Sequence, residues 1–231
     1  MELLIKHMIM GLLSLSILGC DKAPVEEDAY WIWAGIPIVE DYSHKQLYLY
    51  QGRFYLDSGK PTYERRGLYP HSIEATSVFL VFRLDHLVPV KKLLTVVESI
   101  STHWTEKGVN VEGIQLDFDS PTARLLGYSD YLKNVRSMLS NKLKLSITGL
   151  GDWLLASKPG YLEQLADEVD EIVFQLYQGR EELDGLSVYL NALKKVSFPY
   201  KLGVLQSTNK TELEKMQKGR HFRGVIYFVQ L

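Results

Sequence analysis

Polar side chains recur at every second position in a segment that is otherwise apolar. In VEGIQLDFD, residues 111–119, these side chains are Gln115, Asp117 and Asp119. A two-residue period directs side chains to one side of an extended strand. Ionised carboxylates cannot be buried there without partners, because the cost is several kcal/mol. The spacing therefore predicts that the three residues line a shared cavity and bind a polar ligand or transfer protons.

Other apolar segments end in polar or aromatic residues of the same kind. DEIVFQLY carries the same-side pair Gln175 and Tyr177, with Gln178 next to them. Amides, carboxylates, an arginine and tryptophans are suited to binding sugar hydroxyls and stacking on sugar rings. The predicted substrate-binding set is therefore Gln115, Arg83, Asp85, Asp152, Trp153, Gln175, Gln178, Gln206 and Trp33.

The predicted catalytic residues are Asp117, Asp119 and Tyr177. As a hypothesis, Asp119 is the proton donor, Asp117 raises the pKa of Asp119 by like charge, and Tyr177 hydrogen-bonds the substrate. Two other interpretations of the aspartates stay open: ligand binding without turnover, and structural salt bridges with Arg83 or Arg124. A hydrolase needs a second carboxyl group at a suitable separation, and the candidates for it are Asp85, Asp152 and Glu181.

Short apolar runs bounded by Gly, Pro or charged residues predict the strands that position these groups. Helical patterns at 90–107, 123–139, 160–169, 182–196 and 210–218 separate most of them. This alternation predicts an α/β fold, a compact TIM (β/α)8-type barrel whose first βα units are irregular at 40–76. A doubly wound open sheet is the alternative. The predicted strands begin at Tyr30, Leu47, Val78, Val111, Leu143, Asp170, Tyr200 and Arg223.

Composition narrows the classes of function. The net charge of −2 argues against a nucleic-acid partner. Phosphate-binding loops, nucleophile motifs and metal-ligand histidine spacings are missing from the sequence, so we expect no cofactor and no metal. The 231 residues, 46% of them hydrophobic, suit one domain at 30–231. We expect it to be a monomer.

The first twenty residues resemble an export signal that ends in a lipobox. A short polar start precedes the apolar run 8–18, which is too short to span a bilayer, and Ile17-Leu18-Gly19 leads to Cys20, the only cysteine. We expect a signal peptide at 1–19 and a lipidated cysteine and tether at 20–29. The protein would then be anchored in a bacterial cell envelope, facing the periplasm or the exterior. The alternative is an ordinary signal peptide with an incidental cysteine.

The segment 111–119 also resembles the family 18 glycoside hydrolases, the chitinase group, whose fourth strand carries D-G-I-D-I-D-W-E. Gly113, Ile114 and Asp117 match this motif, Gln115 replaces an aspartate, and Asp119 replaces the glutamate that acts as general acid. QLYQ at 175–178 is similar to that group's M-x-Y-D, where Tyr177 matches. Because an aspartate is one methylene shorter than a glutamate, the chitinase-like route is weakened here.

Four segments resemble a bacterial family of unknown function, number 3142, which is grouped with the glycosidase barrels. They are WIWAG, VEGIQLDFDSPTARL, LSITGLGDWL and VDEIVFQLYQG. The first interpretation is therefore a glycoside hydrolase-like lipoprotein that acts on a poly- or oligosaccharide by carboxylate acid/base chemistry. The alternative is a non-catalytic glycan-binding or envelope-assembly lipoprotein on the same fold.

Overall fold

A computed structural model describes residues 26–209, 211, 214–215, 217 and 219–229. The expected signal peptide, Cys20 and the first part of the tether lie outside the described residues, and the expected helix at 210–218 lies partly outside them. Among the described residues, no helix is long and apolar enough to cross a membrane.

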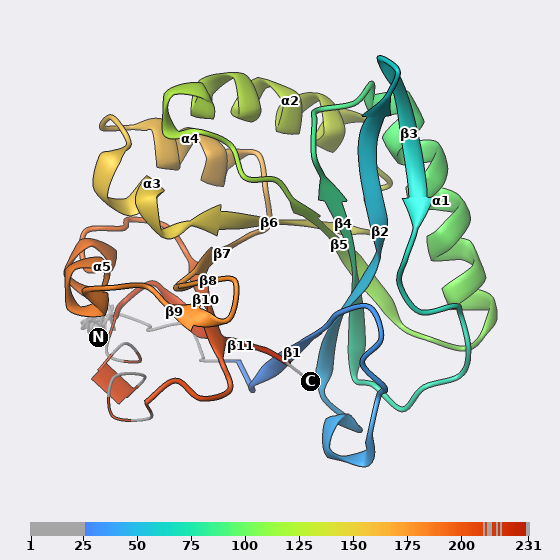
Figure 1. The fold of residues 1–231 in the computed structure, drawn as a ribbon, viewed down its shortest axis with the longest axis horizontal. Helices are drawn as coiled ribbons and strands as arrows, with labels where there is room; N and C mark the ends of the chain where they lie inside the picture. The colour runs from blue at the N-terminus through green and yellow to red at the C-terminus, as the bar shows by residue number, and fades with distance from the viewer. Residues whose placement is uncertain (1–25, 210, 212–213, 216, 218, 230–231) are drawn as a thin grey trace, which may run out of the picture.

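Eight parallel strands close into a barrel, as the sequence predicted (Figure 1). Their order around the ring is β1-β2-β4-β5-β6-β7-β10-β11, and β11 pairs with β1 to complete it. A closed ring excludes the open doubly wound sheet. The strands span Ala29–Ile32 (β1), Gln46–Asp57 (β2), Ser77–Leu84 (β4), Val111–Asp117 (β5), Lys144–Leu150 (β6), Glu171–Gln175 (β7), Tyr200–Leu205 (β10) and Phe222–Phe228 (β11).

Helices cover the outside of the barrel from β4 onward. They span Val90–Glu106 (α1), Leu125–Met138 (α2), Gly151–Ala156 (α3), Tyr161–Asp167 (α4) and Leu186–Leu193 (α5). In α1 the apolar residues spaced three and four apart, among them Leu93, Val97 and Trp104, are buried against the strands. Gly108 follows that helix with φ 81°, a left-handed conformation that favours glycine at a helix end.

The first two crossovers contain no α-helix, in agreement with the irregular first βα units expected from the sequence. A 3-10 turn, Glu40–Tyr42 (η1), lies between β1 and β2. Between β2 and β4, the strand β3 (Lys60–Arg65) folds back antiparallel on β2. Neither this hairpin nor the short pair β8 (Tyr177–Gln178) and β9 (Glu181–Glu182) was predicted from the sequence. The apolar run 30–38 predicted a longer first strand, but β1 ends at Ile32 and the chain turns at Gly35, where φ is 81°.

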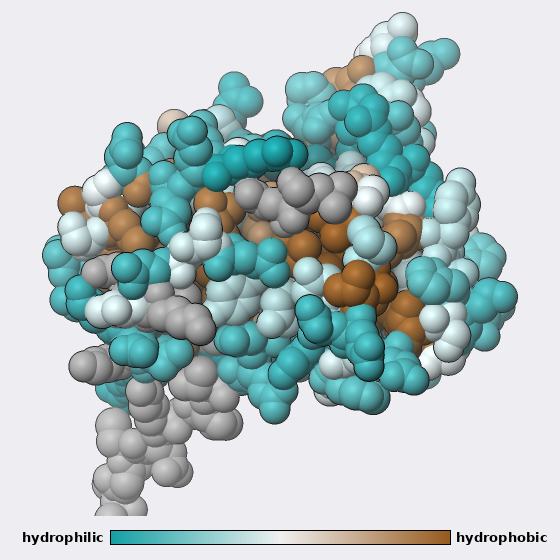
Figure 2. Space-filling view, turned by 60° about the horizontal axis from the view of Figure 1, so that its bottom comes forward, coloured by the Kyte–Doolittle hydropathy of each residue, from teal (hydrophilic) through white to brown (hydrophobic). Residues whose placement is uncertain are grey.

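Two apolar layers result from this arrangement. The larger layer lies between the strands and the helices. The smaller one fills the barrel interior and consists of Ala29, Trp31, Tyr48, Phe79, Val81, Val173 and Ile226. On the face shown in Figure 2, hydrophilic residues form most of the outer surface, and apolar residues show between them near the middle. The interior layer separates the two ends of the barrel, and the polar groups gather at these ends.

Candidate functional site

A cavity of about 470 Å³ opens at the carboxyl ends of the strands. This is the end of a parallel barrel at which binding and catalytic groups are usually found. Its lining includes nine residues of the predicted site: Trp33, Arg83, Gln115, Asp117, Asp119, Asp152, Gln175, Tyr177 and Gln178. The alternate residues Gln115, Asp117 and Asp119 therefore converge on one cavity, as their spacing predicted.

Arg83 lies between the two aspartates. Its Nη1 donates to Asp117 Oδ2 at 3.0 Å, and its Nη2 donates to Asp119 Oδ2 at 2.5 Å. Burial lowers the pKa of Arg83, but the charges of Asp117 and Asp119 outweigh this and raise it above its ordinary value. The structure thus contains the salt bridge to Arg83 that the sequence left as an alternative.

Asp117 is the buried member of the pair. Asp117 is only 3% exposed, and its Oδ1 accepts a hydrogen bond of 2.8 Å from the Thr148 hydroxyl. Burial raises the pKa of the Asp117 carboxyl above its ordinary value, and this outweighs Arg83 and Thr148, which lower it. The side chain of Asp119, by contrast, is 45% exposed. The raised pKa of Asp117 thus comes first from burial, and the like charge of Asp119 adds to it.

Gln115 forms part of the cavity floor and is completely buried. Its Oε1 accepts from Trp31 Nε1 at 2.6 Å, and its Nε2 donates to Ser146 Oγ at 2.9 Å. Ser146 in turn donates to Glu171 Oε1 at 2.7 Å. An indole only donates and a carboxylate only accepts, so these two ends fix the orientation of the Gln115 amide. Gln115 thus holds the floor in place and is not free to bind a ligand by itself.

Aromatic rings form the opposite side of the cavity. Trp33 stacks on Tyr50 with ring centroids 4.2 Å apart, and Tyr177 stacks on Phe228 at 5.2 Å. Trp31 lies beneath them, because Gly203 has no side chain there: a Cβ would lie 2.4 Å from the indole Cζ3. Burial raises the pKa of the Tyr177 phenol, and the nearby Asp117 charge raises it further. The phenol is thus a neutral hydrogen-bonding group.

Three predicted substrate-binding residues lie outside the cavity lining. Trp153 is completely buried, and its Nε1 donates to the Ser120 carbonyl, so its ring is a core residue and cannot serve as a sugar platform. Asp85 is exposed and forms an ion pair with Arg53 at 3.4 Å. Gln206 is exposed in the turn that follows β10. Each follows a strand as predicted, but helix α3 carries Trp153 into the core, and Asp85 lies outside the lining although its Oδ1 is 3.9 Å from Arg83 Nε.

Thr148 and Phe228 also line the cavity and were not predicted from the sequence. Thr148 could have been found from the same two-residue period, since Ser146 and Thr148 are both polar and lie on one side of β6. Within the described residues, no group of three or more His, Cys, Asp or Glu side chains is arranged to hold a metal ion.

The closed ring of parallel strands, with its cavity at their carboxyl ends, is a TIM (β/α)8-type barrel. Two solved structures share this fold. The Bacillus cereus spore cortex-lytic enzyme SleL is 14% identical, with a TM-score of 0.54 over 88% of this chain and 70% of that one. The tamarind chitinase-like lectin is 13% identical, with a TM-score of 0.51 over 87% of this chain and 93% of that one. No curated protein matches.

The chain belongs to the family described as Domain of unknown function (DUF3142), which matches residues 75–198. The matched region runs from just before β4 to just before β10 and contains Arg83, Asp117, Asp119, Thr148 and Tyr177. The matched region thus contains most of the polar residues of the cavity, whereas Trp31 and Trp33 lie outside it.

Proposed function

We propose that this protein binds a poly- or oligosaccharide in the cavity at the carboxyl ends of the strands. The observation that carries the proposal is the composition of the cavity: aromatic rings on one side, and carboxylates, amides and a guanidinium on the other. Sugars present apolar ring faces together with closely spaced hydroxyls, and this two-sided lining complements both features. The cavity volume of about 470 Å³ lies in the range of small-ligand sites.

The binding test compares two aromatic residues. Isothermal titration of the purified full-length chain against soluble oligosaccharides should give a Kd for at least one of them. Trp33→Ala should weaken that Kd by roughly tenfold, which corresponds to about 1.4 kcal/mol. Tyr69→Ala is the matched control, because Tyr69 is 74% exposed and is not part of the cavity lining. No binding to any glycan, or equal losses in both variants, would refute the proposal.

Hydrolysis is the second candidate function. Two features favour it. Asp117 is a buried carboxyl group with a raised pKa, and the neighbouring Asp119 is at the position of the family 18 general acid. Arg83, however, forms hydrogen bonds with both carboxylates. A bound sugar would have to draw Asp119 away from Arg83 before Asp119 could act on a glycosidic oxygen. Binding needs no such step, so we place it first.

One comparison separates the two candidates. The chain and its Asp119→Asn variant are incubated with the glycan that binds, and new reducing ends are measured. Product from the parent chain and at least a hundredfold less from the variant would establish hydrolysis. Binding by both without product from either would establish a non-catalytic glycan-binding protein. The names of the structural neighbours, a lytic enzyme and a lectin, are consistent with either outcome on this fold.

We also propose that the protein is a lipoprotein of a bacterial cell envelope, anchored through Cys20. The support is the sequence Ile17-Leu18-Gly19-Cys20 after an apolar run, with no other cysteine in the chain. Cells fed a radiolabelled fatty acid should incorporate it into the parent chain and not into Cys20→Ser. Equal labelling of the two chains, or none in either, would refute the anchor.

A further inference from the structure

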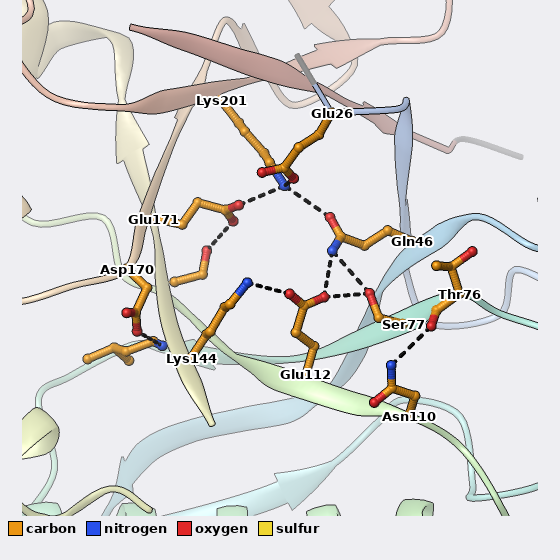
Figure 3. A network of polar contacts seen from close by, with 12 residues as sticks. Glu26, Gln46, Thr76, Ser77, Asn110, Glu112, Lys144, Asp170, Glu171 and Lys201 are labelled. Carbon is orange, nitrogen blue, oxygen red and sulfur yellow. Dashed lines mark hydrogen bonds and ion pairs between the residues drawn. The ribbon is translucent and has the colours of Figure 1, made fainter. Parts of the chain in front are cut away.

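The end of the barrel opposite the cavity contains a second polar cluster, centred on Lys201 (Figure 3). The side chain of Lys201 is only 4% exposed. Its Nζ contacts Glu171 Oε2 at 2.8 Å, Gln46 Oε1 at 3.0 Å and Glu26 Oε2 at 2.6 Å. Glu171, Gln46 and Lys201 all lie at or next to the first residue of their strands, so this cluster closes the amino-terminal end of the barrel.

Glu26 is the first described residue, and it is fixed at this end twice. Besides the ion pair with Lys201, its backbone N–H donates to the Arg223 carbonyl at 2.6 Å. Burial lowers the pKa of Lys201, but Glu171 and Glu26 outweigh this and raise it, so the lysine stays charged. A buried ammonium needs its carboxylate partners, and Glu26 therefore attaches the start of the chain to the barrel.

Only a short length of chain separates this attachment point from Cys20. Six Cα–Cα steps lead from Cys20 to Glu26, and an extended chain covers at most about 3.6 Å per residue. The reach is therefore about 22 Å. Whatever is attached at Cys20 lies within that distance of the Lys201 cluster.

The cavity end of the molecule extends further than this reach. Lys201 contacts both Glu26 and Gln46, so these two residues lie at one level of the barrel. From Gln46 the strand β2 runs to Asp57, beyond the cavity, and its hairpin with β3 projects from the barrel (Figure 1). At about 3.3 Å per residue and a tilt of about 36°, the hairpin tip lies about 30 Å from the level of Glu26.

We propose that the amino-terminal end of the barrel faces the lipid bilayer and that the cavity opens away from it. The inference rests on the proposed lipid anchor at Cys20. With the cavity toward the bilayer, Glu26 would stand about 30 Å from the surface, beyond the reach of about 22 Å. The hairpin tip cannot sink into the bilayer to close this gap, because it carries Asp57, Ser58 and Lys60. A glycan would therefore be bound on the side that faces away from the membrane.

Energy transfer to the bilayer tests the orientation. Asn141→Cys places a fluorophore at the amino-terminal end, just before β6, and Lys60→Cys places one at the hairpin tip; both residues are exposed. Lipidation blocks the thiol of Cys20, so the engineered thiol is the one that reacts. The lipidated full-length proteins are reconstituted in vesicles of phosphatidylethanolamine and phosphatidylglycerol that carry an acceptor dye on the headgroup. Transfer should be several-fold stronger from position 141 than from position 60.

The outcomes distinguish the orientation from the anchor. Vesicle-bound protein with equal transfer from both positions, or with stronger transfer from position 60, would overturn the orientation alone. Cys20→Ser should not bind the vesicles. If the parent chain does not bind them either, the anchor is overturned and the orientation with it. A third chain carries about twenty Gly and Ser residues inserted before Glu26, which lengthens the reach beyond the height of the hairpin. This insertion should reduce the difference between the two positions, and an unchanged difference would contradict the reach argument.

Discussion

Replacing Arg83 with leucine removes the positive charge that faces the buried Asp117 carboxylate. Asp117 keeps only the Thr148 hydroxyl as a hydrogen-bond donor, at 2.8 Å. Breaking a buried ion pair by removing one partner costs about 3–5 kcal/mol. The Arg83 side chain is 29% exposed, so we expect the lower end, about 3 kcal/mol. In a domain of this size that loss lowers Tm by about 6–12 °C.

The pH dependence of this loss is the sharper part of the prediction. Burial raises the pKa of folded Asp117 above the ordinary aspartate value of about 3.9. Such a group contributes stability that is complete below the unfolded pKa and is lost as the pH rises through the folded pKa. Arg83→Leu removes the largest opposing influence, so the folded pKa of Asp117 rises further. The loss should therefore be larger at about pH 8 than at about pH 5.

Urea unfolding of three variants at both pH values measures this effect. The double variant Arg83→Leu/Asp117→Asn should recover at least about half of the loss at the higher pH, because no buried charge remains. Arg136→Leu is the matched control: its side chain is also 29% exposed, but its partner Asp170 is 45% exposed. Its loss should not vary with pH. An equal loss at both pH values in Arg83→Leu, without recovery in the double variant, would refute the reasoning.

Two further predictions concern the barrel interior. Gly203→Ala should displace the Trp31 ring and reduce both stability and the near-ultraviolet circular dichroism, because the new Cβ would lie 2.4 Å from that ring. The control is Gly127→Ala in α2, where nothing lies within 4 Å of the new Cβ. This change should raise the free energy of unfolding by about 0.5–1 kcal/mol. Glu171→Gln should lower the urea midpoint, because it removes one of the two carboxylates of the buried Lys201 ammonium, and the double variant with Lys201→Met should be more stable than Glu171→Gln alone. A midpoint that is unchanged in Glu171→Gln would show that Lys201 is satisfied without it.

Much of the fold could be predicted because the signals were local. Every predicted strand corresponds to an observed strand of the ring, since short apolar runs bounded by turn residues are typical of buried parallel strands. The hairpin β2–β3 was missed for a physical reason. From Arg53 to Arg65 the only apolar run is the three residues 54–56, and β3 itself is mostly polar and only partly buried, so no apolar run of strand length marks it.

Site residues within strands could be predicted, because the two-residue period of a strand gives the side on which each side chain lies. Site residues that follow the strands could not be predicted in this way. Asp117 and Tyr177 follow from strand geometry, and both line the cavity. Trp153 and Gln206 follow strands as well, but the helix α3, which begins directly after β6, directs Trp153 into the core, and the turn after β10 directs Gln206 out to solvent. Loop direction depends on packing between distant elements, which a period in the sequence does not contain.

By itself, the sequence determined the parallel barrel and the side of β5 on which the aspartates lie, because both depend on the spacing of neighbouring residues. Only the tertiary structure decided how these charges are paired. Arg83 is 34 residues from Asp117, and Lys201 is 155 residues from Gln46. The pairing of β4 with β5 places Arg83 beside Asp117, and the closed ring brings Lys201 to Gln46. The same burial that raises the pKa of Asp117 makes its partners necessary.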